Sequence, residues 1–382
     1  MRWIAVVSVL VVMTAACGMP DREYVPATFP ESIAVAPLDE ALTFARADMD
    51  GTLRVLAIGA LAAEHAVAFD LTDELVSGSD DPIALFNALG YDALRERIEL
   101  GLSEAPMEVK VSDLTIPVDL ADAHIAAGTN FAAHAEESDV EDGPFLFAKM
   151  VTPTVFNGTV TAGDALLDYE VELAVVTLDA MPLPKVPEYM GVVLANDFTN
   201  RAALLRHLDP DNVISGDGFT TGKSAEGYLP VGNLFVIPRN LETFLDGIDL
   251  NLAVNGGLRQ RANMKLAIWD IRELMRQIEA RKDVRWDYAG GEVGLPIEDG
   301  VVPARTLILA GTPDGTVFNG IHRGAMIGGA GRWAAGGWGL SITDNVIESY
   351  IASASEAGVY LKPGDVVRIQ VERMGVIETT VE

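Results

Sequence analysis

Glutamates alternate with apolar residues in the run DYEVELAVV, which covers residues 168–176. Side chains on a β-strand point alternately to its two faces, so Glu170 and Glu172 would project together while Val171 packs on the opposite face. Two carboxylates on one face repel each other unless a cation or buried donors offset their charge. The run predicts a strand, either with a functional acidic face or, as the alternative, with a solvated polar face.

A third carboxylate, Asp197, follows the apolar stretch in GVVLANDFTNRA. With Glu170 and Glu172 it completes a ligand set made of oxygen atoms only. Oxygen ligands favour hard cations, so we expect Mg²⁺ or Mn²⁺, with Ca²⁺ as an alternative, rather than zinc. The three carboxylates therefore predict a metal-dependent enzyme.

The charge balance limits the partners of the chain. Among 382 residues there are 56 acidic side chains and 27 lysines or arginines, for a formal net charge of −29. So acidic a chain repels nucleic acid and anionic lipid surfaces. We therefore expect that it has no nucleic-acid partner. We expect it to attach to a membrane only through a lipid anchor. An anionic substrate would need local positive charge, for which Lys149, Arg201 and Lys223 are the candidates.

The first residues indicate export. Arg2 precedes an apolar run, from Trp3 to Ala16, that is shorter than the roughly 20 residues needed to cross a bilayer. We expect residues 1–16 to be a signal peptide. Cys17, the single cysteine of the chain, follows small residues as in a bacterial lipoprotein. This similarity implies lipidation of Cys17 and a position on the periplasmic face of the outer membrane, with an ordinary cleaved signal or a buried N-terminal helix as alternatives.

Sequence patterns divide the rest of the chain into three parts. Residues 17–31 are rich in proline and predict a tether after the lipidated cysteine. Residues 32–119 alternate short apolar runs with one helical segment, which predicts a small β-rich N-terminal domain. Residues 120–382 are strand-rich and predict an α+β catalytic domain. Within it, residues 263–282 predict an amphipathic helix, and the final alternating run predicts a hairpin at Met374-Gly375.

Eight blocks between about residue 120 and residue 382 resemble, in order, the fumarylacetoacetate hydrolase family. They are AAGTNFAAHAEE, PFLFAKMVTPTVFNG, DYEVELAVV, GVVLANDFTNRA, GDGFTTGKS, LAVNGGLRQ, ILAGTPDG and YLKPGDVVRIQVERMGVIETTV. The resemblance implies that family's mixed β-sandwich or roll for the catalytic domain, and a homodimer. The order of the blocks supports the fold, while the reaction has to be argued from the site.

The resemblance also implies residue roles. Glu170, Glu172 and Asp197 match the metal ligands of the family. His134 and Glu137 match its histidine–glutamate pair, in which the carboxylate orients the imidazole and the imidazole activates water. Their spacing of three residues suits one helical turn, so the two side chains can meet.

Further matches concern the substrate. Lys223 corresponds to a lysine that neutralises negative charge developing on the substrate. Lys149, Arg201 and Thr312 correspond to substrate-binding positions, although Arg201 could instead pair with a ligand acid and Thr312 could serve a tight turn. Ala127 stands where true fumarylacetoacetate hydrolases carry an additional aspartate, which favours the acylpyruvase-like branch.

These matches predict a hydrolase that cleaves a carbon–carbon bond in an acylpyruvate or a related 2,4-dioxo acid. A metal-dependent decarboxylase, hydratase or isomerase acting on a 2-oxo acid is the nearest alternative, and a non-catalytic envelope binding protein is another. Residues 316–358 are an insertion relative to the compact family pattern. Their glycines and two tryptophans fit a lid over the site, a surface elaboration or an oligomer contact.

Overall fold

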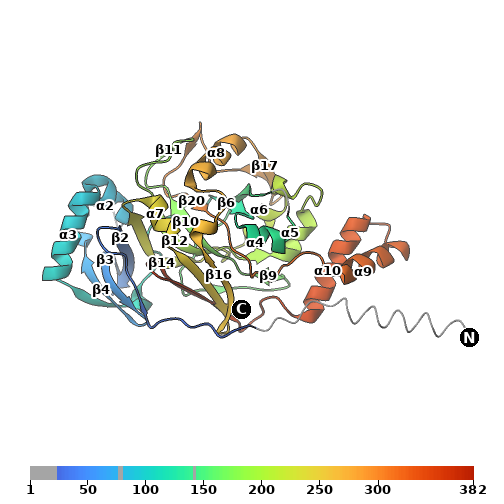
Figure 1. Cartoon of the computed structure of the whole chain (residues 1–382), viewed down its shortest axis with the longest axis horizontal. Coiled ribbons are helices and arrows are strands. Elements are labelled where there is room, and N and C mark those ends of the chain that lie inside the picture. The colour runs from blue at the N-terminus through green and yellow to red at the C-terminus, as the bar shows by residue number, and fades with distance from the viewer. Residues whose placement is uncertain (1–23, 76–80, 141–142) are drawn as a thin grey trace, which may run out of the picture.

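The computed structural model describes residues 24–75, 81–140 and 143–382 (Figure 1). Cys17, the predicted signal peptide and the first part of the predicted tether lie outside the described residues. Among the helices in those ranges, none is both long enough and apolar enough to span a bilayer. The architecture is a strand-rich mixture of sheets and helices, which confirms the predicted α+β, β-rich class.

A large mixed sheet forms the centre of the described part of the chain, with 11 strands. All neighbours pair antiparallel except β20 and β6, which are parallel. In spatial order the strands are β5 (Met107–Lys110), β4 (His65–Asp70), β3 (Thr52–Ala62), β2 (Ala41–Met49), β14 (Val231–Pro238), β12 (Gly191–Asn196), β10 (Val171–Val176), β20 (Leu307–Leu309), β6 (His124–Gly128) and β7 (Phe145–Lys149), with β1 (Ser32–Ile33) beside β3.

The N-terminal strands belong to this same sheet. β2 pairs with β14, where Phe44 lies opposite Phe235, and both strands are almost wholly buried. Residues 32–119 and 120–382 thus share one sheet and one hydrophobic core, and the boundary between two domains stays a prediction.

A second sheet packs against the first and contains the end of the chain. Its order is β16 (Gly257–Asn263), β15 (Asp249–Val254), β21 (Val366–Val371), β22 (Gly375–Val381) and β8 (Thr159–Val160). The predicted C-terminal hairpin is present, with Val371 opposite Gly375. Gly375 has φ +89°, a left-handed conformation that glycine adopts without strain. Three two-stranded pairs complete the strands: β9 (Leu167–Asp168) with β13 (Thr199–Asn200), β11 (Met181–Pro182) with β19 (Val301–Val302), and β17 (Arg285–Tyr288) with β18 (Gly291–Gly294).

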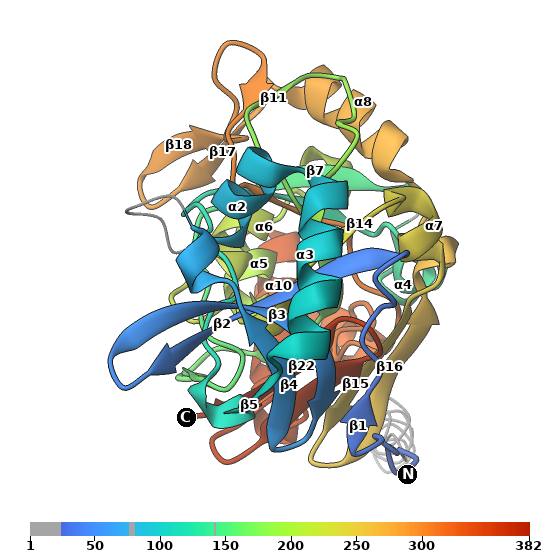
Figure 2. The same ribbon diagram turned by 90° about the vertical axis from the view of Figure 1, so that its left-hand side faces the viewer.

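Helices cover the outer strands. α2 (Pro82–Leu89) and α3 (Tyr91–Glu104) lie over the N-terminal strands (Figure 2). They divide the single predicted helical segment, because Gly90 takes φ +76°. α8 (Ile271–Arg281) is shorter than predicted, since Asp270 caps its N-terminus by accepting from the Glu273 N–H. α7 is Leu241–Asp246, and single 3₁₀ turns occupy Thr72–Glu74, Val111–Asp113, Val213–Ser215 and Met264–Leu266.

The insertion forms a helical hairpin that projects from the body of the molecule (Figure 1). Its helices are α9 (Arg323–Ala334) and α10 (Ile342–Ala357), and α10 starts with a capping box between Ser341 and Asp344. The hairpin is anchored through a small apolar cluster in which Ile347 and Tyr350 join Leu204 and Leu205 of α5 (Arg201–His207). Ile327 on α9 and Trp338 in the connection between the two helices are 62% and 72% exposed.

Candidate metal centre and active site

The three predicted metal ligands lie together in the centre of the large sheet. Glu172 is in β10, Glu170 comes directly before that strand, and Asp197 comes directly after β12. Antiparallel pairing of β10 with β12 brings these positions side by side, and the Asp197 N–H donates to the Glu170 carbonyl at 2.9 Å. One oxygen from each carboxylate lies within 4.8 Å of the others, and all three residues are buried.

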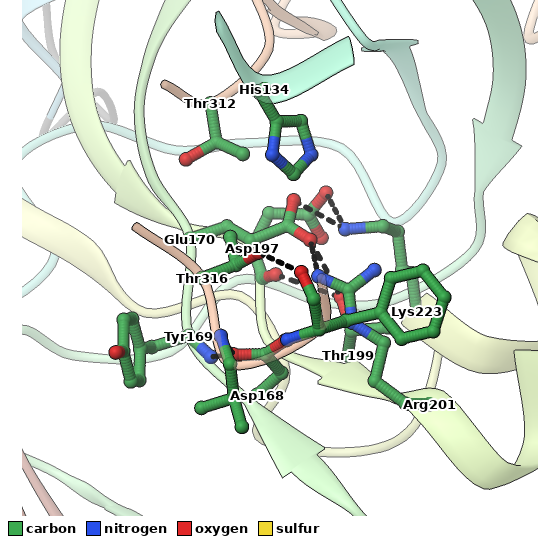
Figure 3. Close-up of polar contacts among 12 residues, drawn as sticks. His134, Asp168, Tyr169, Glu170, Asp197, Thr199, Arg201, Lys223, Thr312 and Thr316 are labelled. Carbon is green, nitrogen blue, oxygen red and sulfur yellow. Dashed lines mark hydrogen bonds and ion pairs between the residues drawn. The ribbon is translucent and has the colours of Figure 1, made fainter. Parts of the chain in front are cut away.

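Two lysines hold Glu170 and Asp197 in place, and Figure 3 shows one of them, Lys223. Lys223, which ends the short helix α6 (Phe219–Lys223), donates to Glu170 Oε2 at 2.6 Å and to Asp197 Oδ2 at 2.9 Å. Lys149, at the end of β7, donates to Asp197 Oδ1 at 2.5 Å and to the carbonyl oxygen of Lys223. Asp197 is therefore clamped between two buried cations.

Arg201 links the cluster to a fourth acid, Asp168. At the first position of α5, its guanidinium donates from Nε to Asp168 Oδ2 at 2.8 Å and from Nη2 to Glu170 Oε1 at 2.6 Å. Asp168 also accepts from the backbone N–H groups of Val317 and Phe318 at 2.9 and 3.1 Å. It thus ties the start of the insertion to the acidic cluster.

The electrostatics of the cluster suit a bound cation. Burial alone would raise the pKa of Glu170, but Lys223 and Arg201 lower it to about 2. Burial together with Asp197 and Glu170 raises the pKa of Glu172 well above 4.5. Four buried carboxylates face three buried cations, so one negative charge remains when all are ionised. An all-oxygen donor set with surplus negative charge is what a hard divalent ion requires.

The predicted histidine–glutamate pair is also formed. His134 and Glu137 lie on the one-turn helix α4 (Ala132–Glu137), with His134 Nδ1 3.5 Å from Glu137 Oε2. That same carboxylate oxygen accepts from the Gly315 N–H at 2.9 Å. In Figure 3 the imidazole of His134 points toward the carboxylates of Glu170 and Asp197. The sequence block AGTPDG therefore helps to hold the glutamate carboxylate that lies beside the histidine.

A cavity of about 240 Å³ opens onto this machinery. Six of the nine residues predicted for the site line it: His134, Glu170, Asp197, Arg201, Lys223 and Thr312. Glu137 and Glu172 lie behind this lining. Lys149 is also behind it, fully buried, and its partners are Asp197 and Lys223. The geometry of Lys149 therefore fits a residue that supports Asp197, one of the predicted metal ligands.

Thr312 keeps its hydroxyl within the protein. Its Oγ1 donates to the Val171 carbonyl at 3.0 Å and accepts from Gln260 Nε2 at 2.9 Å. Gln260 Oε1 in turn accepts from the Val171 N–H at 2.9 Å. These bonds fix the start of β10, which carries Glu172.

Sequence reasoning missed Asp168 and Gln260. For Asp168 a signal was present, because it continues the period-two series of acids that includes Glu170 and Glu172. Gln260 ends the block LAVNGGLRQ, but a single glutamine gives no indication of its partner 89 residues away.

Comparisons with known proteins identify the relatives of this chain. Residues 123–382 match the family model described as the C-terminal domain of fumarylacetoacetate (FAA) hydrolase. An uncharacterized protein of Methanocaldococcus jannaschii is 30% identical over 159 residues, which are 40% of this chain and 62% of that relative. The mitochondrial oxaloacetate decarboxylase of Dictyostelium discoideum is 25% identical over 50% of this chain and 81% of its own length. The 2,4-didehydro-3-deoxy-L-rhamnonate hydrolase of a Sphingomonas species is 27% identical over 40% of this chain and 54% of its own length.

Solved structures share the fold. A fumarylacetoacetate hydrolase from Exiguobacterium antarcticum superposes with a TM-score of 0.56 at 20% identity, over 89% of this chain and 99% of that one. A 5-carboxymethyl-2-hydroxymuconate delta-isomerase from Mycobacterium smegmatis superposes with a TM-score of 0.51 at 19% identity, over 89% of this chain and 98% of that one. The similar proteins thus include a hydrolase, an isomerase and a decarboxylase.

Proposed function

The chain belongs to the fumarylacetoacetate hydrolase family, and from this premise we propose that it is a divalent-metal-dependent hydrolase. Its proposed substrate is an acylpyruvate or a related 2,4-dioxo acid, in which it would cleave a carbon–carbon bond. The enzymes of this family include hydrolases, isomerases and decarboxylases, so the class of reaction has to be argued from the site.

One observation carries the proposal. A buried group of three carboxylates, with oxygens within 4.8 Å of one another, lies beside a cavity that His134 and Lys223 both line. Glu170, Glu172 and Asp197 would hold the cation, for which Mg²⁺ or Mn²⁺ is proposed and Ca²⁺ is the alternative. When bound, the cation would supply Lewis-acid polarisation of the carboxylate and 2-oxo oxygens of the substrate.

The side chains of this chain supply the remaining chemistry. His134, oriented by Glu137, would take a proton from water so that the hydroxyl adds to the acyl carbonyl carbon. The bond between that carbon and the neighbouring methylene then breaks, and the electron pair leaves with the three-carbon fragment. Lys223, which lines the cavity beside the carboxylates, would neutralise the negative charge that this fragment gains, and return of the proton to the methylene carbon would give pyruvate and a carboxylic acid.

Decarboxylation is the second candidate. Of the three sequence relatives described above, the oxaloacetate decarboxylase has the largest share of its own length covered by this chain, 81%. That reaction needs no water-activating base. The buried pair of His134 and Glu137 therefore favours hydrolysis, and a histidine that proves dispensable would favour decarboxylation.

Metal replacement tests the function. The protein is stripped of metal, resupplied with Mg²⁺ or Mn²⁺, and given acylpyruvates and oxaloacetate while their ultraviolet absorbance is followed. We expect metal-dependent loss of acylpyruvate that is absent in Glu172→Gln. Rapid loss of oxaloacetate alone would favour the decarboxylase. Failure to bind metal would overturn the mechanism and favour a non-catalytic binding protein.

Export remains part of the proposal. We infer that residues 1–16 are removed, that Cys17 carries the lipid, and that the enzyme is held at the periplasmic face of the outer membrane as a homodimer. Labelling of cells with a radioactive fatty acid should mark the wild type and not Cys17→Ser. Fractionation and light scattering test the location and the dimer.

A further inference from the structure

We propose that the acyl group of the substrate is an uncharged, apolar chain of several carbons, rather than an acetyl group or a chain ending in a second carboxylate. This inference rests on the proposed function, because it names the part of the substrate that lies beyond the 2-oxo acid. It follows from the division of the cavity into a charged end and an apolar end.

Helix α5 runs from one end to the other. Arg201, its first residue, is bound to the acidic cluster, while Leu204 and Leu205 on the helix, and Leu208 directly after its end, line the cavity farther along. At 1.5 Å per residue, these leucines extend the apolar wall to about 10 Å from Arg201. A substrate anchored at the carboxylates would therefore lay its distal part along leucine side chains.

The insertion supplies another part of the apolar lining. Phe318, Ile321 and Met326 line the cavity from the chain that leads into the hairpin and from α9 itself. Phe318 is fixed there, since its N–H donates to Asp168 and its ring lies 5.6 Å from the Arg201 guanidinium carbon. The remaining apolar lining includes Phe147, Phe219, Val213, Pro210 and Val140.

The charges near the cavity disfavour a second carboxylate. Among the described residues that line it, the permanent cations are Arg201 and Lys223, and both are bound to carboxylates of the cluster. Asp139, an exposed acid, also lines the cavity and would repel a distal anion. Moving a carboxylate into an apolar wall without a partner is costly, whereas burying methylene groups there is favourable.

A substrate series tests the inference. With the full chain and Mg²⁺, kcat/KM is measured for acetyl-, butanoyl-, hexanoyl- and succinylpyruvate. We expect about a fourfold rise for each added methylene until the cavity is filled. Succinylpyruvate, which carries a carboxylate in place of the terminal methyl of butanoylpyruvate, should be at least tenfold poorer than it. A preference for acetyl- or succinylpyruvate would overturn the inference.

A pair of variants tests the insertion wall. Ile321→Arg places a cation at the apolar end, and Ile327→Arg makes the same change on the exposed face of α9, where the side chain is 62% exposed and outside the cavity lining. We expect Ile321→Arg to lower kcat/KM for hexanoylpyruvate and to raise it for succinylpyruvate. Ile327→Arg should change neither. Equal effects of the two variants would contradict the assignment of this wall.

A binding measurement separates this inference from the proposed function. Saturated 2-oxo acids of increasing length cannot undergo the proposed cleavage, and their Kd values are measured by calorimetry. If no acylpyruvate is hydrolysed but Kd falls about fourfold per methylene, the reaction is wrong and the apolar subsite stands. If acylpyruvates are hydrolysed but neither Kd nor kcat/KM depends on chain length, the subsite is wrong and the reaction stands.

Discussion

The ammonium group of Lys223 lies 2.6 Å from Oε2 of Glu170, so a cation of the protein already binds a carboxylate that is proposed to ligate the metal. It reaches Asp197 as well, at 2.9 Å. Lys223 also lines the cavity. The same ammonium group can therefore stabilise the ligand acids before the metal binds and face the substrate afterwards.

Replacing Lys223 by methionine separates these two roles. The variant leaves Glu170 and Asp197 with less positive charge, so the metal-free protein should lose about 3–5 kcal/mol of unfolding free energy, the usual result of breaking a buried ion pair. Mn²⁺ should bind at least as tightly as to the wild type, while kcat falls by about 10²–10³. Loss of Mn²⁺ binding in calorimetry would contradict this account of the site.

Glu172 should make the stability of the metal-free protein depend on pH. Its pKa is raised in the folded state, so the folded protein holds a proton that the unfolded chain releases above about pH 4.5. Unfolding free energy should fall as pH rises from 4.5 through the raised pKa, and Glu172→Gln should remove this part of the slope. Denaturant titrations at a series of pH values measure the unfolding free energy of both proteins. Identical dependence of that free energy on pH in the two proteins would be inconsistent with the burial of Glu172 beside Glu170 and Asp197.

Metal should reverse that loss of stability. At a concentration 100 times its Kd, a cation that binds only the folded protein adds about 2.7 kcal/mol. The gain should appear in the wild type and be much smaller in Glu172→Gln, as read from the midpoint of thermal unfolding with and without Mg²⁺.

His134 should be required for hydrolysis but not for metal binding. We expect His134→Gln to lower kcat by about 10²–10⁴ with little change in the Kd of Mn²⁺. Glu137→Gln should cause a smaller loss, because Glu137 acts by orienting the imidazole. The result that would count against this role is full activity in His134→Gln.

Asp168 should matter chiefly for stability. Asp168→Ala leaves the buried guanidinium of Arg201 without one partner and frees the N–H groups of Val317 and Phe318. We expect a loss of about 3–5 kcal/mol in denaturant unfolding. Asp92→Ala, which removes an ion pair with Arg239 whose two side chains are 78% and 42% exposed, is the control and should cost less than about 1 kcal/mol.

His124 should make the fold sensitive to acid. Burial lowers its pKa from 6.5 to about 3, so below pH 6.5 the unfolded chain binds a proton that the folded protein excludes. Stability is therefore lost as pH falls through this window, by about 2 kcal/mol between pH 7 and pH 5. His124→Asn should lose less over the same range, while a variant of the exposed His65 should follow the wild type.

Local patterns predicted much of the site. Alternation placed Glu170 and Glu172 together, helical spacing let His134 meet Glu137, and period two with a Met-Gly turn predicted the terminal hairpin. Each of these relations depends on the geometry of one strand, one turn or one helix. Such geometry follows from a few neighbouring residues.

Contacts between segments far apart in the chain could not be predicted from the sequence patterns. Lys149 has the pattern of a substrate-binding lysine, yet its partner Asp197 lies 48 residues away and turns it inward. The pairing of β2 with β14, which merges the N-terminal strands into the central sheet, joins segments about 190 residues apart. The insertion was predicted from the sequence. Its position beside α5, however, depends on packing among Leu205, Ile347 and Tyr350. Alternation and spacing carry no information about such partners.

Product analysis of a ¹³C-labelled butanoylpyruvate, incubated with the Mg²⁺-loaded protein in H₂¹⁸O, is the most direct measurement of the proposed reaction. Hydrolysis predicts pyruvate and butanoate in equal amounts, with ¹⁸O in the new carboxylate of butanoate. Release of labelled CO₂, formation of an isomer, or an intact substrate after complete metal loading would contradict it.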